Sequence, residues 1–433
     1  MESSVARTGR KTPACPGEGR DSGGLRRRDV IALGLAAGLS QGLPAFGQQT
    51  MASVGAPAAG PFVRAVGTHF ELAGRPFRVT GVNNHYLAYA SKGEVMRVLD
   101  AAVAMRANVV RTFLQPVIGS LDGATPTIWD WKSRSDASDL GVNGAYLLYW
   151  DSAKGEMAVN TGPNGFQKVD FLIDECRKRG LKLILAFLDF WAYTGGAQQM
   201  RSWYGSDDMY TFFFVDPRTR RDYKAWVQQV LTRVNPLTKT AYRDETAIFA
   251  WDLMNEPNAR PADALNAWLA EMSAFVKSVD PNHMLASGHG NVGDRPTDLH
   301  VADLDFTTWH GYPLYQKLSP TGFNTFINKF CALARVADKP VLLEEFGYAR
   351  SNPDQVAAYQ MWLDTMRKNP DCAGWLVWRL VGRQDSGRYP VDNDPHSQFD
   401  VHENGGPLWS VLRNAALAET LQETPGSSPE GER

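Results

Sequence analysis

The sequence has few cysteines, almost no net charge and no long apolar run. Four cysteines occur in 433 residues and none forms a CxxC pair, so neither a disulfide-rich scaffold nor a zinc site is indicated. The 45 basic and 47 acidic side chains give a net charge of −2, which offers no basic surface to nucleic acid or to an anionic membrane. No apolar run reaches the roughly 18 residues needed to cross a bilayer. The sequence therefore favours neither a nucleic-acid partner nor a membrane span.

The first 47 residues have the pattern of an export signal. An arginine pair, Arg27-Arg28, precedes an apolar stretch over residues 30–43, and small residues follow that stretch. The segment resembles a twin-arginine leader. We therefore expect residues 1–47 to direct export to the periplasm or the extracellular space. Residues 48–61 are rich in Ala, Gly and Pro and are expected to form a linker.

The cysteines of the remaining chain are expected to be ordinary core residues. Cys15 belongs to the leader, which leaves Cys176, Cys331 and Cys372. Three cysteines cannot all pair, and a buried thiol behaves as a small apolar side chain. The alternative in which two of them form one disulfide stays open.

Residues 62–421 are expected to form one domain, followed by a disordered tail over residues 422–433. The composition, 43% apolar with 13 Trp and 14 Tyr, is sufficient for a large core. Short apolar strands alternate with amphipathic helices, a pattern typical of an α/β fold with a parallel sheet. Eight strands are predicted at Val79–Asn83, Asn108–Phe113, Leu181–Leu188, Ile248–Met254, Met284–Ser287, Phe306–His310, Val341–Glu345 and Trp375–Trp378.

Helices are predicted between most of these strands. A capping box at Ser91 and Glu94 begins the first helix. The last helix of the series is expected to begin with Asn352 as its cap and Pro353 in its first turn. The other helices are predicted at Gln167–Arg179, Tyr223–Val234, Ala262–Val279 and Phe323–Val336, whereas the link between the fifth and sixth strands is too short for a full helix.

Eight strand–helix units in one domain favour a single closed (β/α)8 TIM barrel over an open doubly wound sheet. No GxGxxG follows the first strand, which removes the dinucleotide-binding alternative. Residues 63–79 alternate and turn at Ala73-Gly74, so we expect a short N-terminal β-hairpin that covers the bottom of the barrel.

Reactive side chains of such a barrel lie at the carboxyl ends of its strands. In this sequence polar and aromatic residues occupy these positions: Arg111, Asp189, Trp191, Asn255, Glu256, His310, Tyr312, Glu344, Glu345, Trp378 and Arg379. Glu256 follows the fourth strand and Glu345 ends the seventh, so the two carboxylates are expected to face each other across the barrel mouth. Two facing carboxylates are what glycoside hydrolysis requires.

Two motifs carry a resemblance to a known family. Trp251–Pro257, read as Trp-Asp-Leu-Met-Asn-Glu-Pro, and Leu343–Gly347, read as Leu-Glu-Glu-Phe-Gly, resemble the signatures of retaining glycoside hydrolases of family 5. The segment Asp189–Gln199, with its aromatics, Gly-Gly pair and glutamines, is most similar to the loop of endo-β-1,4-mannanases in that family. The resemblance implies a secreted, monomeric enzyme that cleaves a β-linked polysaccharide without a cofactor or metal.

The resemblance also implies roles for single residues. Glu345 would be the nucleophile and Glu256 the acid/base catalyst. The substrate-binding residues would be Arg111, Trp191, Asn255, His310, Tyr312 and Trp378. Tyr193, Trp203 and Tyr204 are expected to offer further aromatic platforms for sugar rings.

Charge considerations predict different protonation states for the two glutamates. Arg111 is expected to keep Glu345 ionised, with a hydroxyl donor from Tyr312 assisting it. The negative charge of Glu345 should in turn raise the pKa of Glu256, as an acid requires. Glu344 competes for the nucleophile position, but neighbouring strand residues point to opposite faces, and Phe-Gly after Glu345 matches the family.

Substrate and mode of action stay open among related alternatives. The same carboxylates would serve a β-1,4-glucanase or an exo-acting β-mannosidase. The long aromatic insert over residues 119–161 could close one end of the cleft, which would favour exo action. A non-catalytic carbohydrate-binding barrel is the alternative from another class, but it predicts loss of a catalytic carboxylate, and both are present.

Overall fold

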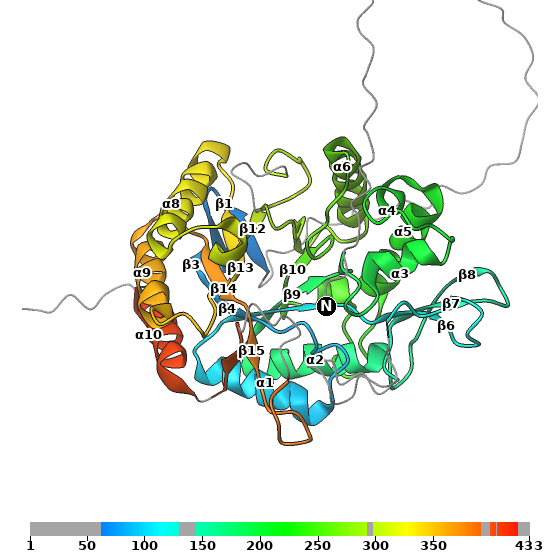
Figure 1. Ribbon diagram of the computed structural model, residues 1–433, viewed down its shortest axis with the longest axis horizontal. Coiled ribbons are helices and arrows are strands. Elements are labelled where there is room, and N and C mark those ends of the chain that lie inside the picture. The colour runs from blue at the N-terminus through cyan, green and yellow to red at the C-terminus, as the bar shows by residue number, and fades with distance from the viewer. Residues whose placement is uncertain (1–61, 130–143, 292–297, 391–398, 404, 423–433) are drawn as a thin grey trace, which may run out of the picture. The chain divides into compact units, whose positions relative to one another are not determined.

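Eight parallel strands form a barrel at the centre of the structure, and helices stand around them (Figure 1). A computed structural model describes residues 62–129, 144–291, 298–390, 399–403 and 405–422. All of these belong to one unit of the chain, and the predicted leader, linker and final residues lie outside them. No helix within the described ranges is long and apolar enough to cross a membrane.

The barrel strands are the eight that the sequence predicts; the first has the predicted bounds and the others end at slightly different residues. They are β4 (Val79–Asn83), β5 (Val109–Phe113), β9 (Lys182–Ala186), β10 (Ile248–Asp252), β11 (Met284–Ala286), β12 (Thr307–Gly311), β13 (Val341–Phe346) and β14 (Gly374–Val377). Seven parallel pairings join them from β11 through β4 to β12. The remaining seam is closed by backbone hydrogen bonds from Asp305 to Leu285 (2.9 Å) and from His310 to Gly290 (2.6 Å). The (β/α)8 prediction is confirmed.

The helices surround the barrel in chain order. The long ones are α1 (Lys92–Ala104), α2 (Phe166–Arg179), α5 (Pro217–Thr232), α6 (Ala262–Val279), α8 (Pro320–Ala337), α9 (Gln355–Lys368) and α10 (Gly406–Gln422). Short ones are α3 (Gly196–Ser202), α4 (Phe212–Val215), α7 (Pro313–Gln316) and the 3₁₀ turn η1 (Tyr242–Asp244). Between β11 and β12 no described residue is helical, as predicted.

Local capping explains where the helices agree with prediction and where they differ. The Ser91–Glu94 capping box at α1 is present, with both reciprocal hydrogen bonds formed. Helix α5 begins six residues before its predicted start, because the Asp216 side chain accepts a hydrogen bond from Arg218 and Pro217 occupies the first turn. Helix α9 begins at Gln355 and not at Pro353, since residues 352–354 form a turn.

The N-terminal segment is a three-stranded antiparallel sheet, one strand more than the predicted hairpin. Its strands are β1 (Val63–Val66), β2 (His69–Leu72) and β3 (Arg75–Phe77). The additional turn lies at Gly67, whose φ of +55° suits glycine. Phe70 of this sheet is fully buried at the amino end of the barrel, where its ring meets those of Phe249 (5.0 Å) and Phe306 (5.3 Å). The sheet thus covers the bottom, as expected.

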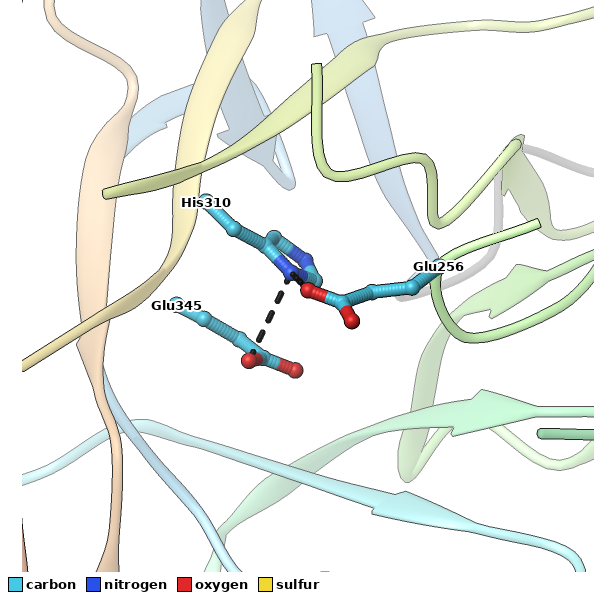
Figure 2. A group of neighbouring side chains, drawn as sticks. All are labelled: Glu256, His310 and Glu345. Carbon is cyan, nitrogen blue, oxygen red and sulfur yellow. Dashed lines mark hydrogen bonds and ion pairs between the residues drawn. The ribbon is translucent and has the colours of Figure 1, made fainter. Parts of the chain in front are cut away.

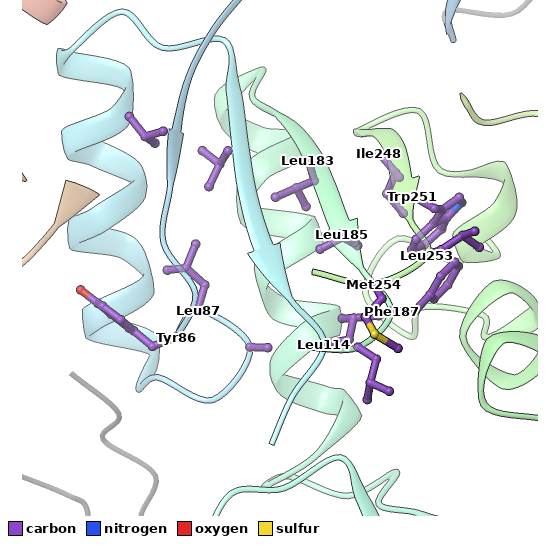
Figure 3. Packing of buried hydrophobic residues seen from close by; sticks show 14 of the residues in the cluster. Tyr86, Leu87, Leu114, Leu183, Leu185, Phe187, Ile248, Trp251, Leu253 and Met254 are labelled. Atoms are coloured by element: carbon purple, nitrogen blue, oxygen red, sulfur yellow. The ribbon is translucent and has the colours of Figure 1, made fainter. Parts of the chain in front are cut away.

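Two apolar layers hold the barrel. The inner one joins Phe70 to inward residues such as Val79, Ile184 and Leu342. The outer one packs the other face of each strand against the helices, and Figure 3 shows part of it, with Leu183 and Leu185 of β9 near Trp251 of β10. The three predicted core cysteines are buried and unpaired, so the disulfide alternative is not observed.

The insert after β5 forms a small sheet beside the barrel. Its strands are β6 (Val117–Ser120), β7 (Leu148–Asp151) and β8 (Glu156–Val159). Trp129 is buried, and its indole donates a hydrogen bond to the Val117 carbonyl (3.0 Å). Trp131 lies outside the described residues. The remaining small pairing joins β15 (Leu380–Val381) to β16 (Val401–His402).

The buried ring of Phe70 fills the bottom of the barrel as a plug, and it should contribute most of the stability of this end. We expect Phe70→Ala to lower the free energy of unfolding by about 3 to 5 kcal/mol, because a fully buried ring leaves a cavity that three elements line. Urea unfolding followed by circular dichroism measures this. Val66→Ala on the same small sheet, at a side chain that is 42% exposed, is the control and should change it by no more than about 0.5 kcal/mol. An equal effect of the two variants would contradict the plug.

Candidate active site

The predicted polar residues meet at the carboxyl end of the barrel, opposite the Phe70 plug. Figure 2 shows Glu256, His310 and Glu345 pointing toward one another, with one edge of the imidazole facing both carboxylates. His310 Nδ1 lies 2.7 Å from Glu256 Oε1 and 3.4 Å from Glu345 Oε2. The three ligand-type atoms of this group all lie within 4.8 Å of one another. The predicted juxtaposition of the two glutamates is therefore observed.

Arg111 is fully buried beneath these groups and uses its guanidinium to connect several strands. Its Nε donates to Asp252 Oδ2 (2.8 Å), Nη1 to Glu345 Oε1 (2.7 Å) and to Asn83 (3.2 Å), and Nη2 to Asn255 Oδ1 (3.0 Å). Burial lowers the pKa of an arginine, but the surrounding carboxylates outweigh it and keep this pKa above its usual value. The predicted contact between Arg111 and Glu345 is confirmed.

Asp252 and Asn83 are the residues of this network that sequence reasoning missed. Both are buried and both accept hydrogen bonds from Arg111. A signal existed for each: Asp252 is a charged residue in an otherwise apolar strand, and Asn83 ends the first strand at the same level as Arg111, with which it pairs in register.

The end of β13 departs from regular alternation and brings both of its glutamates to the interior. The register of β12 and β13 shifts between Trp309 and His310, so that His310 pairs with Glu345. Glu344 is fully buried, with Oε2 3.3 Å from Arg111 Nη2 and 3.4 Å from His310 Nε2. The expectation that the two glutamates point to opposite faces is wrong, because the irregularity removes the two-residue period here.

Each oxygen of Glu345 has its own donor. Arg111 holds Oε1, and the Tyr312 hydroxyl donates to Oε2 at 2.7 Å, as predicted. Burial raises the pKa of Glu345, and the nearby cations of His310 and Arg111 only partly oppose this. Burial also raises the pKa of the Tyr312 hydroxyl, further helped by the Glu345 charge, so the hydroxyl keeps its proton as a donor.

Glu256 is held by donors on both oxygens. His310 Nδ1 contacts Oε1, and the Trp191 indole donates to Oε2 at 2.7 Å. Its backbone adopts a φ of +48°, an unusual value for a side-chain-bearing residue, and its N–H donates to Gly288 (2.9 Å). This backbone turns the carboxylate toward the barrel axis immediately after the fourth strand.

The prediction of a raised pKa for Glu256 is wrong for the free protein, where this pKa is lowered. Burial alone would raise the pKa of Glu256, but the hydrogen bond and charge of His310, with the Trp191 donor, bring it down to about 2. Burial would lower the pKa of His310, yet the carboxylates around it raise that pKa to about 10. The prediction considered Glu345 alone and omitted the two donors on Glu256. In the free protein the proton of the Glu256–His310 pair therefore resides on the imidazole.

Asn255 connects the guanidinium to a further buried acid. Its Oδ1 accepts from Arg111, and its Nδ2 donates to Asp189 Oδ1 at 2.9 Å. Burial raises the pKa of Asp189 to about 7, although the Asn255 bond opposes this. The side chain is thereby fixed next to Glu256, where the sequence places it.

The aromatic residues of the predicted cleft differ in their exposure. Trp378 is half-buried and stacks on His85 with a centroid distance of 5.5 Å, and Tyr193 is 60% exposed. Trp203 is only 7% exposed and its indole donates to the Ile118 carbonyl, so its expected role as a sugar platform is wrong. Tyr204 is half-buried, and its hydroxyl donates to Asp222.

Among the described residues, Glu256, His310 and Glu345 are also close enough together to hold a metal ion. In this group the imidazole holds a proton beside two carboxylates, an arrangement suited to glycoside hydrolysis, which needs no metal ion. Their arrangement is accounted for by that chemistry.

A (β/α)8 barrel with two close glutamates at the ends of its fourth and seventh strands is the framework of a glycoside hydrolase. The family model described as "GH family 5 beta-mannosidase-like" matches residues 162–371. "Putative mannan endo-1,4-beta-mannosidase 9" of Oryza sativa subsp. japonica is 35% identical over 370 residues, covering 74% of this chain and 82% of that protein. The chain belongs to glycoside hydrolase family 5 and is a glycoside hydrolase.

Other relatives and solved structures agree with this assignment. "Mannan endo-1,4-beta-mannosidase F" of Aspergillus clavatus is 26% identical, covering 77% of this chain and 74% of that protein. The endo-β-1,4-mannanase of Thermotoga petrophila is 26% identical with a TM-score of 0.67, covering 82% of this chain and 79% of that one. The endo-1,4-β-mannanase of Rhizomucor miehei shares the fold, with a TM-score of 0.70 at 24% identity over 83% and 99% of the two chains.

The guanidinium fork of Arg111 should not be replaceable by an ammonium group. We expect Arg111→Lys to lower kcat/KM for a β-linked aryl glycoside by at least about 100-fold, because each lost charge-assisted hydrogen bond is worth about 1.5 to 3 kcal/mol. Steady-state kinetics of the purified variant measure this. The matched control is Arg233→Lys, which alters a pair with the buried Asp170 in the outer helices and should leave kcat/KM unchanged. Similar losses in both variants would mean that Arg111 is only structural.

Proposed function

We propose that this protein is a retaining endo-β-1,4-mannanase that acts through Glu256 and Glu345. The observation that carries the proposal is the distance between the two carboxylates, which have oxygens within 4.8 Å of each other. Retaining enzymes hold their carboxyl groups about 5 to 5.5 Å apart, whereas inverting enzymes leave space for a water between them. The short separation supports a covalent glycosyl-enzyme intermediate.

Glu345 is assigned as the nucleophile. Its two oxygens are fixed by Arg111 and Tyr312, which orients the carboxylate toward the mouth and disperses its charge. One oxygen attacks the anomeric carbon and forms a glycosyl ester while the bond to the leaving sugar breaks. Glu345 must be ionised to attack. Because its pKa is raised, low pH protonates it and stops this step.

Glu256 is assigned as the acid/base, working with His310. The pair holds one proton, located on His310 Nδ1 in the free protein, 2.7 Å from Glu256 Oε1. When the leaving oxygen takes a proton from Glu256, the imidazole supplies that proton to the carboxylate. In the second step Glu256 removes a proton from the attacking water and the pair regains it, so one water is consumed per bond cleaved.

The sugar is expected to contact groups next to this pair. Asn255 lies beside Glu256 and is assigned to the sugar 2-hydroxyl, since one hydrogen of its amide is used by Asp189 and the other is available. Trp378 is assigned as the platform under the reacting ring, where stacking is worth about 0.5 to 2 kcal/mol. Trp191 reaches the mouth through its bond to Glu256 and can contact the leaving sugar.

Mannan as the substrate is supported by the relatives, whose names specify mannan endo-1,4-β-mannosidases. The exo-acting alternative is favoured by one observation: the β6–β8 sheet contacts α3, the helix that follows the carboxyl end of β9. Export is a further proposal, supported by the pattern of residues 1–47, which lie outside the described residues.

Digestion of defined polysaccharides tests the substrate and the mode of action together. We expect mannan to be degraded to mixed short oligosaccharides, with a kcat/KM at least about tenfold above that on carboxymethyl cellulose, since one misplaced hydroxyl costs about 1 to 3 kcal/mol. Chromatography of the products over time measures both. Release of mannose alone from the first minutes would indicate exo action, and preference for cellulose would overturn the mannan assignment.

Alanine variants of the two glutamates distinguish their roles. We expect Glu256→Ala to lose about 10²- to 10⁴-fold on mannan and much less on a dinitrophenyl glycoside, whose leaving group needs no acid. With added azide it should form the β-glycosyl azide. Glu345→Ala should hydrolyse neither substrate and should form the azide of opposite configuration.

Glu271→Gln is the control for these two variants. Glu271 pairs with Arg220 and Lys224 on the outer helices, so its replacement should leave both rates unchanged. If Glu256→Ala and Glu345→Ala gave the same azide product, the division of roles would be wrong.

A further inference from the structure

Glu344 is a buried acid that the mechanism described above does not use. It is fully buried at the end of β13, next to the assigned nucleophile. Its Oε2 lies 3.3 Å from Arg111 Nη2 and 3.4 Å from His310 Nε2. Its Oε1 has no hydrogen-bond partner within the described part of the chain. Burial of an acid in this way has a large desolvation cost, which indicates that Glu344 has a function.

We propose that Glu344 is a positioning residue that holds the His310 imidazole doubly protonated and aims its Nδ1–H at Glu256. The proposal rests on the proposed function, because it concerns the proton that the acid/base pair delivers. It assigns the first glutamate of Leu-Glu-Glu-Phe-Gly a role separate from that of the second, the assigned nucleophile.

The geometry places the imidazole between carboxylates on both sides. Nε2 faces Glu344, and Nδ1 faces Glu256 at 2.7 Å and Glu345 at 3.4 Å. A neutral imidazole donates from one nitrogen only, so two acceptors on opposite sides favour the doubly protonated ring. A carboxylate behind an imidazole fixes its orientation and stabilises its charged form, as in a hydrolytic triad.

The strand irregularity is what makes this contact available. Without the shift between β12 and β13, Glu344 and Glu345 would point to opposite sides of the sheet. With it, one strand supplies both the assigned nucleophile and the support of the proton donor. The two roles therefore depend on the same local backbone.

The charged groups around Glu344 and His310 come from several strands. Arg111 of β5 and His310 of β12 are the cations, and Asp252, Glu256, Glu344 and Glu345 are the acids, with Tyr312 and Asp189 adjoining them. Four carboxylates exceed two cations. Burial, with the charge of Glu344, raises the pKa of Asp252 to about 7, and Asp252 Oδ1 is also without a partner in the described chain. Asp252 and Glu344 thus each have one oxygen without a partner in the described chain, and Glu344 is the acid that contacts His310 Nε2.

Nuclear magnetic resonance of ¹⁵N-histidine-labelled protein tests the proposal without substrate. His310 is assigned by the signals lost in His310→Asn. We expect both ring nitrogens of His310 to stay protonated up to about pH 9, and its pKa to fall by about 1 unit in Glu344→Gln, which keeps the side-chain size and removes the charge. If only one ring nitrogen of His310 were protonated at pH 7 in the unaltered protein, the proposal would be wrong, whatever the result in the variant.

The matched control is Asp280→Asn at another buried acid–histidine pair, in which Asp280 Oδ2 lies 2.7 Å from His283 Nδ1. This variant should lower the melting temperature and leave the titration of His310 unchanged. A merely structural role for Glu344 would give the same result in Glu344→Gln, and would contradict the proposal.

Kinetics then connect the titration to hydrolysis. In Glu344→Gln we expect kcat on mannan to fall about tenfold with little change in KM, and the alkaline limb of the kcat profile to move to lower pH by the same shift as the His310 pKa. An unchanged alkaline limb alongside a shifted His310 would mean that the imidazole proton is not the one delivered. If the protein hydrolyses no β-mannan, the proposed function fails, while the resonance experiment still decides the role of Glu344.

Discussion

The site depends on the burial of one guanidinium group among hydrogen-bond acceptors. Arg111 has no exposure to solvent, and a charge in the interior is tolerated only when its hydrogen bonds are satisfied. Its nitrogens reach acceptors on five side chains, which come from β4, β10, the segment after β10 and β13. Removal of any acceptor would leave part of that charge unpaired. The guanidinium therefore fixes the assigned nucleophile and the positions of Asp252, Asn255 and Glu344 together.

A barrel is well suited to provide such a centre, because parallel strands bring their carboxyl ends to one point. The amino end is closed by apolar packing around Phe70, and the carboxyl end by charge around Arg111. Different interactions stabilise the two ends. Burial of apolar surface stabilises the amino end, and complementary hydrogen bonds stabilise the carboxyl end. The long helices outside the strands supply the rigid packing that keeps both ends in register.

Much of this could be predicted from the sequence, for identifiable reasons. The eight strands were predictable because buried parallel strands are continuous apolar runs, and Glu256 and Glu345 because they follow two of these runs within motifs of the family. The inward position of Glu344 was not predictable, since it depends on a register shift between strands 30 residues apart. The protonation of Glu256 was not predictable either, because it depends on which atoms of His310 and Trp191 reach its oxygens. The turn at Gly67 and the helix α10 were missed, and so was the early start of α5, although Asp216 and Pro217 are a helix-start signal present in the sequence.

The low pKa of Glu256 is compatible with its proposed role as an acid when the proton is assigned to the Glu256–His310 pair. His310 takes a proton near pH 10 and Glu256 takes another near pH 2, so between these values the two side chains together hold one proton. A proton on His310 Nδ1, which lies 2.7 Å from Glu256 Oε1, is available over this whole range, and a hydrogen bond of that length gives it a direct route. The supply of the proton then does not limit hydrolysis in mild acid. Of the two assigned carboxylates, Glu345 loses its charge first at low pH, because burial raises its pKa whereas that of Glu256 is lowered, so the assigned nucleophile and not the assigned acid sets the acidic limit under the proposed mechanism.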